Sequence, residues 1–343
     1  MPDPGPDEER RRARLAVALA LLTALLGLAG LGAGSGGWAW PFGEADAALI
    51  VGEIRAPRTL GAWLVGALLG LAGAVAQGLF RNPLADPYLL GSASGASLAV
   101  VLVLAAGTLA GQGLDLATVD LLLRTGLVAA AFAGALGGVL LTLALAAGAQ
   151  QTLRLLLAGV VVGVVLGAAS DLVTLAAPEA LRGKQIFLLG STGLLGWPAV
   201  ALLAAGLALA LPPAWRLARG LDALALGEDT ARSLGLQVAR LRLVLVTLMA
   251  LATGVAVSQA GLVAFVGLVA PHLVRRFAPA PQGYTLVASA AMGGTLLLAA
   301  DVLARSLIAP EELPVGVLTA LLGGGYLLWL LHRRAAAALG GRL

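Results

Sequence analysis

The sequence predicts an all-α, polytopic membrane protein. Of the 343 residues, 59% are apolar and only 12% are charged, which is about half the charged share of a typical soluble domain. Runs without any charged residue cover residues 15–34, 59–80, 87–114, 125–153 and 243–271. An apolar run of about 20 residues is long enough to cross a bilayer, and lipid offers no partners for the backbone, so each run is expected to be helical. A large soluble helical protein is disfavoured, because several runs exceed an ordinary buried helix.

About ten membrane spans follow from these runs, and no soluble domain is expected. The run 243–271 is too long for one span and too short for two full ones. Gly261 is the expected break, because interrupted spans commonly line transport pathways. The predicted spans are 15–34, 58–80, 91–110, 121–147, 154–176, 197–214, 241–259, 262–275, 284–304 and 315–332.

The basic residues predict the sidedness of these spans. With ten spans and a cytoplasmic N-terminus, 16 of the 22 basic residues fall on the cytoplasmic side, as the positive-inside rule requires. Merging the seventh and eighth spans would move the C-terminus outside and remove this bias. In the ten-span topology the outer side holds only six basic residues, which are Arg55, Arg58, Arg124, Arg182, Lys184 and Arg305.

Both termini are expected in the cytoplasm, as an N-terminal segment 1–14 and a C-terminal tail 333–343. A cleaved signal peptide resembles the N-terminal region, but its apolar part measures about 7–15 residues. The uncharged stretch 15–34 is longer, so an uncleaved first span is favoured. Glycines spaced three or four residues apart, such as Gly66 and Gly70, predict close helix packing.

Several kinds of chemistry have no basis in the sequence. There is no cysteine, and neither His272 nor His332 has a spaced partner for a metal. Lys184 follows Gly183, but Pro178 stands where a phosphate-binding loop needs its first glycine. The chain is therefore expected to bind no ATP, to hold no cofactor or metal and to be no enzyme.

Two acidic residues lie within predicted spans, Asp171 and Asp301. Ionisable groups in spans commonly mark ion pathways, but neither residue has an evident mid-membrane partner. We expect each to make a helix-end or interhelical hydrogen bond.

The longest polar connection is residues 215–242, where glycines divide short, partly amphipathic pieces. Glu228 and Asp229 suit a helix N-terminus. From the residues alone, this element either lies on the bilayer surface or docks a partner.

Four segments together resemble permeases of the FecCD type, which serve bacterial importers of iron–siderophore, haem and cobalamin. The first begins RAPRTLGAW and contains RNPLADP; the others are LGEDTARSLG, GLVAFVGLVAPHLVRR and ADVLARSLIAPEELPVGVL. They occur in the family's order and spacing, over residues 55–96, 226–235, 261–276 and 300–331.

The resemblance implies a type II importer permease fold, with a permease domain over residues 15–332 in a bacterial or archaeal cytoplasmic membrane. Two copies would form the pathway for a metal chelate, two separate ATPase subunits would bind ATP and Mg²⁺, and a periplasmic or lipid-anchored binding protein would deliver the substrate. The remaining contacts would be with membrane lipid, and no nucleic acid is expected.

The resemblance also assigns roles to individual residues. Arg55, Arg58 and Arg305 match arginines that pair with glutamates of the binding protein, although helix-end arginines are common. The segment 226–235, within an element at about 221–239, matches the ATPase coupling element. Its residues are Gly227, Glu228, Asp229, Arg232, Leu234 and Gly235.

A cytoplasmic gate is implied at Asn82, Pro83 and Leu84, with a second loop near Gln151 and Thr152. His272 matches a family signature and is expected to be structural. The implied mechanism is alternating access. The alternatives are an ion-coupled secondary transporter and, without a catalytic constellation to support it, a membrane-embedded enzyme. Which chelate is carried cannot be read from these motifs.

Overall fold

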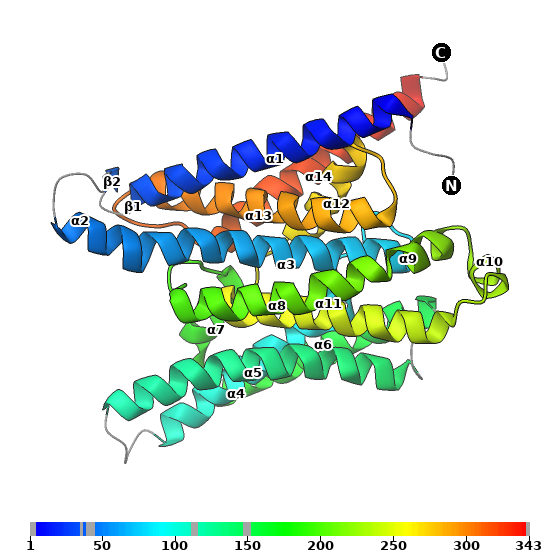
Figure 1. The fold of residues 1–343 in the computed structure, drawn as a ribbon. Coiled ribbons are helices and arrows are strands. Elements are labelled where there is room, and N and C mark those ends of the chain that lie inside the picture. Colours follow the sequence, from blue (N-terminus) through cyan, green and yellow to red (C-terminus); the bar gives the residue numbers. More distant parts are fainter. Residues whose placement is uncertain (1–4, 35–36, 39–44, 111–115, 147–151, 341–343) are drawn as a thin grey trace.

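The computed structural model describes residues 5–34, 37–38, 45–110, 116–146 and 152–340, and they form a single bundle of helices (Figure 1). Each predicted span corresponds to a helix. In order these are α1 (Pro6–Gly32), α3 (Ala56–Phe80), α4 (Ser92–Ala110), α5 (Leu116–Leu145), α6 (Thr152–Ala176), α8 (Trp197–Arg216), α11 (Val238–Ala260), α12 (Val266–Phe277), α13 (Gln282–Ser306) and α14 (Val315–Gly340).

Seven helices of the described chain are long and apolar enough to cross a membrane, and α4 and α14 contain shorter apolar stretches. At twelve residues, α12 is too short to span alone. The all-α membrane architecture is confirmed, and the number ten is approximate. No soluble domain is present in the described residues.

Short elements join the long helices. They are β1 (Ala33–Gly34), β2 (Gly37–Trp38), α2 (Ala45–Ile50), the π-helical η1 (Val51–Arg55), the 3₁₀-helix η2 (Pro87–Leu90), α7 (Ala180–Leu189), α9 (Ala218–Ala225) and α10 (Glu228–Ser233). The two strands pair antiparallel. Helix α7 was not among the predicted elements; it lies between the predicted spans 154–176 and 197–214.

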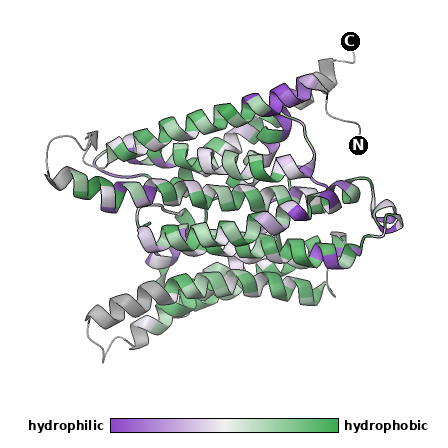
Figure 2. Ribbon diagram, viewed as in Figure 1, coloured by the Kyte–Doolittle hydropathy of each residue, from purple (hydrophilic) through white to green (hydrophobic). Residues whose placement is uncertain are grey.

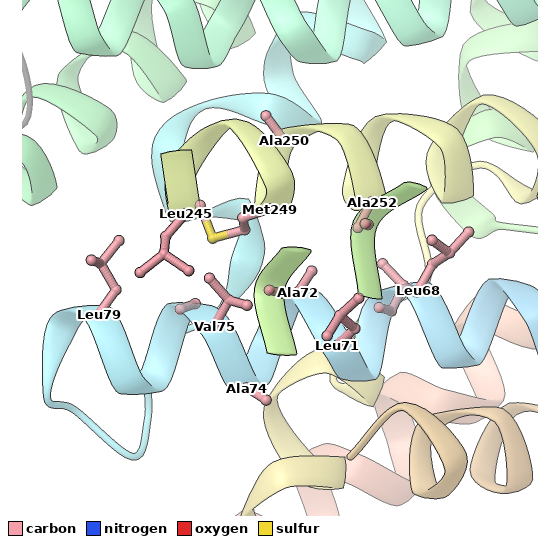
Figure 3. Close-up of a cluster of buried hydrophobic side chains, with 14 of the residues drawn as sticks. Leu68, Leu71, Ala72, Ala74, Val75, Leu79, Leu245, Met249, Ala250 and Ala252 are labelled. Carbon is pink, nitrogen blue, oxygen red and sulfur yellow. The ribbon is translucent and has the colours of Figure 1, made fainter. Parts of the chain in front are cut away.

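Helix α3 is the centre of the bundle and is buried over most of its length. On one side, Val75 and Leu79 face Leu245 and Met249 of α11 (Figure 3). On the other side, α3 lies so close to α13 that a Cβ added to Gly66 would stand 2.2 Å from the Gly293 carbonyl oxygen. The glycine pattern therefore acts as predicted, by letting two helix backbones approach each other.

The chain breaks at Gly261, as the sequence predicted. Gly261 ends α11 with φ +68°, and a Cβ there would lie 2.5 Å from the Phe187 carbonyl oxygen. Residues 261–265 are not helical, and α12 begins at Val266. The Leu262 N–H donates to the Phe187 carbonyl at 2.9 Å, so a neighbouring element satisfies part of the interrupted backbone.

Hydrophilic residues gather at the ends of the bundle and apolar residues lie between them (Figure 2). At one end, called here the Asp301 end, the start of α3 meets the ends of α1 and α13, through Arg58, Asp301 and Arg305. At the other, the Glu228 end, α10 lies beside the end of α3 and the start of α11. Helix α1 begins and α14 ends at the Glu228 end (Figure 1).

Candidate functional sites at the two ends of the bundle

Asp301 is the centre of a buried ionic network. Its side chain is 0% exposed and its Oδ1 accepts hydrogen bonds from Arg58 Nε at 3.0 Å and Thr192 Oγ1 at 2.5 Å. Its Oδ2 accepts from Arg305 Nη2. Arg58 also pairs with Glu312 at 2.8 Å. Two cations therefore face two carboxylates, which compensates charges that would be costly to bury alone.

Arg305 ties three helices together. It is 1% exposed, and its Nη1 donates to the carbonyl oxygen of Gly30 in α1 at 3.0 Å. Its Nη2 donates to Thr59 Oγ1 of α3 at 3.3 Å. Because the guanidinium presents several donors in a fixed plane, one residue of α13 can hold both neighbours.

Arg55 satisfies the end of α1. Its Nη1 donates to the carbonyl oxygens of Leu31 at 3.2 Å and Gly32 at 2.7 Å. The last carbonyls of a helix have no helical donor, so this side chain caps α1.

The structure therefore places all three arginines predicted for docking at the Asp301 end, and it engages each of them inside the chain. The sequence analysis expected Asp301 to make a helix-end or interhelical bond, and it does. It did not predict the roles of Thr192 and Glu312. The spacing of Asp301 and Arg305, four residues apart on one helix, was the signal that could have revealed their pairing.

The predicted coupling element forms α9 and α10 at the Glu228 end. Gly227 and Gly235 bracket α10 with φ +122° and +81°, a region that favours glycine. Leu221 and Leu224 are buried and anchor α9 in the bundle. At the tip, Leu226 and Leu234 are 72% and 65% exposed.

Glu228, the first residue of α10, connects this element to the bundle. It accepts from Arg242 of α11 and from Arg232 at 3.4 Å, and it lies 3.9 Å from Arg81 at the end of α3. Arg232 also pairs with Asp229 at 3.0 Å. Arg242 was not predicted as a site residue, because a single arginine at a helix start carries no distinguishing pattern.

The predicted gate residues Asn82, Pro83 and Leu84 form an exposed turn directly after α3. Asn82 Oδ1 accepts from the Leu84 N–H at 2.9 Å, which is a turn that asparagine favours. Thr152 begins α6 and accepts from Arg242 Nη2 at 2.9 Å. Gln151 lies outside the described residues.

Asp86 follows the gate turn and caps η2, where its Oδ1 accepts from the Tyr88 N–H at 2.8 Å. Burial raises the pKa of Asp86 from 3.8 to about 6, and the hydrogen bond from Tyr88 opposes this rise. Tyr88 in turn donates its hydroxyl to the Val263 carbonyl at 3.2 Å, so the turn is linked to the interrupted segment 261–265.

Two further polar residues singled out from the sequence, Asp171 and His272, have interhelical partners. Asp171 of α6 accepts from Lys184 Nζ of α7 at 2.6 Å. His272 packs edge-on against Tyr326, with ring centroids 5.9 Å apart. Among the described residues, no three His, Cys, Asp or Glu side chains gather as metal ligands would.

Comparison with known proteins agrees with this architecture. The chain is 40% identical over 285 residues to the hemin transport system permease protein of Yersinia pestis, covering 82% of this chain and 83% of the relative. It is 42% identical over 296 residues to the vitamin B12 import system permease protein of Serratia proteamaculans, covering 85% and 84%. A cobalamin import system permease protein of Halobacterium salinarum is 36% identical over 305 residues, covering 87% and 78%.

A solved structure has the same fold over nearly the whole chain. It is described as an inward-facing conformation of a metal-chelate type ABC transporter, and it matches with a TM-score of 0.83 at 27% identity, covering 94% of this chain and 99% of that one. The fold is that of a type II ABC importer permease, a membrane component that leaves ATP hydrolysis to separate subunits. The model of the FecCD transport family matches residues 15–333, and the chain belongs to that family.

Proposed function

We propose that this protein is the membrane subunit of an ATP-binding cassette importer that moves a metal chelate into the cytoplasm. The substrate class is iron–siderophore, haem or cobalamin, and transport proceeds by alternating access between two copies of the chain. The family match and the names of the hemin and vitamin B12 permeases support this class. We expect the choice among these chelates to be made by the binding protein.

The observation that carries the proposal is the form of the Glu228 end. Helix α10 projects beyond the long helices (Figure 1) and exposes Leu226 and Leu234. Exposed leucines on a short element anchored by ion pairs suit an apolar groove on a partner. That partner is an ATPase subunit, which supplies the ATP and Mg²⁺ sites.

The Asp301 end receives the substrate-binding protein. Glu312 is 30% exposed and holds Arg58 Nη1 at 2.8 Å, so it connects the buried network to the surface. A carboxylate of the binding protein takes the place of Glu312 at Arg58. Arg55 and Arg305 support this site from beneath by holding α1, α3 and α13 together.

The orientation follows from both assignments. The Glu228 end, with the first and last residues of the bundle, faces the cytoplasm of a bacterial or archaeal cell. The Asp301 end faces outward. The excess of arginine near the Glu228 end supports this placement.

Transport by the reconstituted complex tests the proposal. The chain is placed in proteoliposomes with its ATPase and its binding protein, and uptake of haem, cobalamin and an iron–siderophore is measured. ATP-dependent uptake of one of these is expected, and none by the chain alone. Uptake by the chain alone, driven by a proton or sodium gradient, would identify an ion-coupled secondary transporter instead.

A test of docking at the Asp301 end requires a variant that leaves the buried network intact. Charge reversal at the buried arginines would disturb the network that holds the fold, so Glu312→Gln is the informative change. It removes the carboxylate that competes for Arg58, so the affinity for the binding protein is expected to rise. Unchanged affinity in Glu312→Gln and in Arg58→Gln would place the docking site elsewhere.

A further inference from the structure

We propose that Arg242 is a positioning residue that links movement of the ATPase-binding element to the gate at the start of α6. This inference rests on the proposed function and goes further, by assigning the link to one side chain. Arg242 is 2% exposed. Its Nη2 donates to Thr152 Oγ1 at 2.9 Å and also to Glu228. One guanidinium thus joins α10, α11 and α6.

Glu228 is a junction of three arginines from three elements. Arg242 comes from α11, Arg232 from α10 itself, and Arg81 from the end of α3 at 3.9 Å. Arg81 has φ +50° and immediately precedes the gate turn at residues 82–84. A displacement of Glu228 therefore acts on the charged neighbours of both predicted gate segments.

The two bonds of Arg242 differ in strength. The guanidinium donates in both, but only the contact with Glu228 adds the attraction of an opposite charge, and a buried cation that loses its carboxylate is strongly destabilised. When an ATPase subunit moves α10, Arg242 therefore follows Glu228, and the bond to Thr152 stretches or breaks. The first turn of α6 is the element that responds.

The link can be measured on the isolated chain, because the chain contains no cysteine. Leu155→Cys places one thiol in the first turn of α6, at a position that is only 1% exposed, so a maleimide reagent reaches it only when this turn opens. Glu228→Gln and Arg242→Gln are each expected to raise the labelling rate by at least about threefold, as local opening becomes easier. Arg240→Gln is the matched control, because Arg240 is exposed on the same helix, and its labelling rate is expected to stay unchanged.

A double substitution tests whether the effect passes through Arg242. Glu228 and Thr152 share Arg242, so Glu228→Gln and Thr152→Val together should change the labelling rate by less than the product of their separate factors. When Arg242→Gln is already present, neither Glu228→Gln nor Thr152→Val should change the labelling rate further. Independent, multiplicative effects in the native background would overturn the proposal, as would an unchanged rate in Arg242→Gln.

The complete complex supplies the functional result. With Arg242→Gln, the ATPase subunits should remain bound and hydrolyse ATP, while substrate taken up per ATP falls about tenfold, within the range of typical coupling energies. Arg242→Lys keeps the charge but loses the planar fork. Its substrate uptake per ATP should lie between that of Arg242→Gln and that of the native chain. Uptake per ATP unchanged in both variants overturns the link. A native complex that fails to transport contradicts the proposed function instead, and the labelling experiment still decides the role of Arg242.

Discussion

Asp301 and Arg305, one helical turn apart on α13, form an ion pair that solvent does not reach. Asp301 also holds Arg58 from α3. Asp301→Asn would leave two buried guanidinium groups with one fewer negative charge. Breaking a buried pair in this way costs about 3–5 kcal/mol, so a large fall in the melting temperature in detergent is expected.

Glu312→Gln is the control for this experiment, because Glu312 is partly exposed and pairs with the same Arg58. A partly exposed pair contributes up to about 1 kcal/mol. Equal losses of stability in Asp301→Asn and Glu312→Gln would show that burial of Asp301 is not what makes the network important.

The close contact between α3 and α13 requires glycine at the crossing positions, because its side chain is a hydrogen atom and not a methyl group. In Gly66→Ala, the new Cβ would stand 2.2 Å from the Gly293 carbonyl oxygen, and in Gly70→Ala it would stand 2.1 Å from that of Ser289. Both atoms are backbone, so the helices must separate. Overpacking of this kind costs about 1–3 kcal/mol, measured as a lower melting temperature.

Gly137→Ala on α5 is the matched control, because nothing lies within 4 Å of a Cβ at Gly137. It should be neutral or slightly stabilising, since alanine has the higher helix propensity. If Gly137→Ala lowered the melting temperature and Gly66→Ala did not, the packing described for α3 would be wrong.

The raised pKa of Asp86, in the connection that follows α3, predicts that the stability of the folded chain depends on pH. Its pKa is raised to about 6, so between pH 4 and 6 the folded chain binds a proton that the unfolded chain has released. Its contribution to stability is therefore greatest in acid and declines as the pH rises through about 6. Asp86→Asn keeps an oxygen for the Tyr88 N–H and should flatten the melting-temperature profile between about pH 4 and 6.5.

Asp229→Asn is the comparison for Asp86, because the Asp229 side chain is almost fully exposed. Its profile should follow that of the native chain. If Asp86→Asn and the native chain have parallel profiles, the titration seen between about pH 4 and 6.5 belongs to another group.

The exposed tip of α10 predicts a defect in assembly that leaves the fold intact. Leu234→Asp places a charge on a side chain that already faces solvent, so the melting temperature of the isolated chain should hold. Co-purification of the ATPase subunits should fall at least about tenfold, because a buried anchor of an interface is worth about 2 kcal/mol or more. Arg240→Gln should leave co-purification unchanged, and retention of the ATPase by Leu234→Asp would exclude Leu234 as an anchor.

Local patterns were enough to predict the spans and the break at Gly261. The long uncharged runs had to be helical in lipid, and the run 243–271 had a length that only an interrupted helix could accommodate. Helix α7 was missed, and one of its charges is compensated by a residue of another helix. Lys184 pairs with Asp171 of α6, and a pairing between helices leaves no periodic signal in one sequence.

The candidate sites were predicted by position and not by environment. Their segments were recognisable, and the three arginines do gather at one end. Whether an arginine faces solvent or another helix depends on how the helices pack, and here Asp301, Glu312 and the carbonyls of α1 enclose them. The role of Arg242 depends on Thr152, which lies 90 residues away in the sequence.

The sequence by itself determined that this chain is a helical membrane protein of the FecCD transport family, because hydrophobic length, charge distribution and family motifs are local properties of the chain. The tertiary structure alone decided which charges meet. A buried guanidinium must be compensated wherever the fold places it, so Arg58 and Arg305 meet at Asp301, and Arg242 lies between Glu228 and Thr152. These contacts join segments far apart in the chain, and only the packing of the helices brings them within hydrogen-bonding distance.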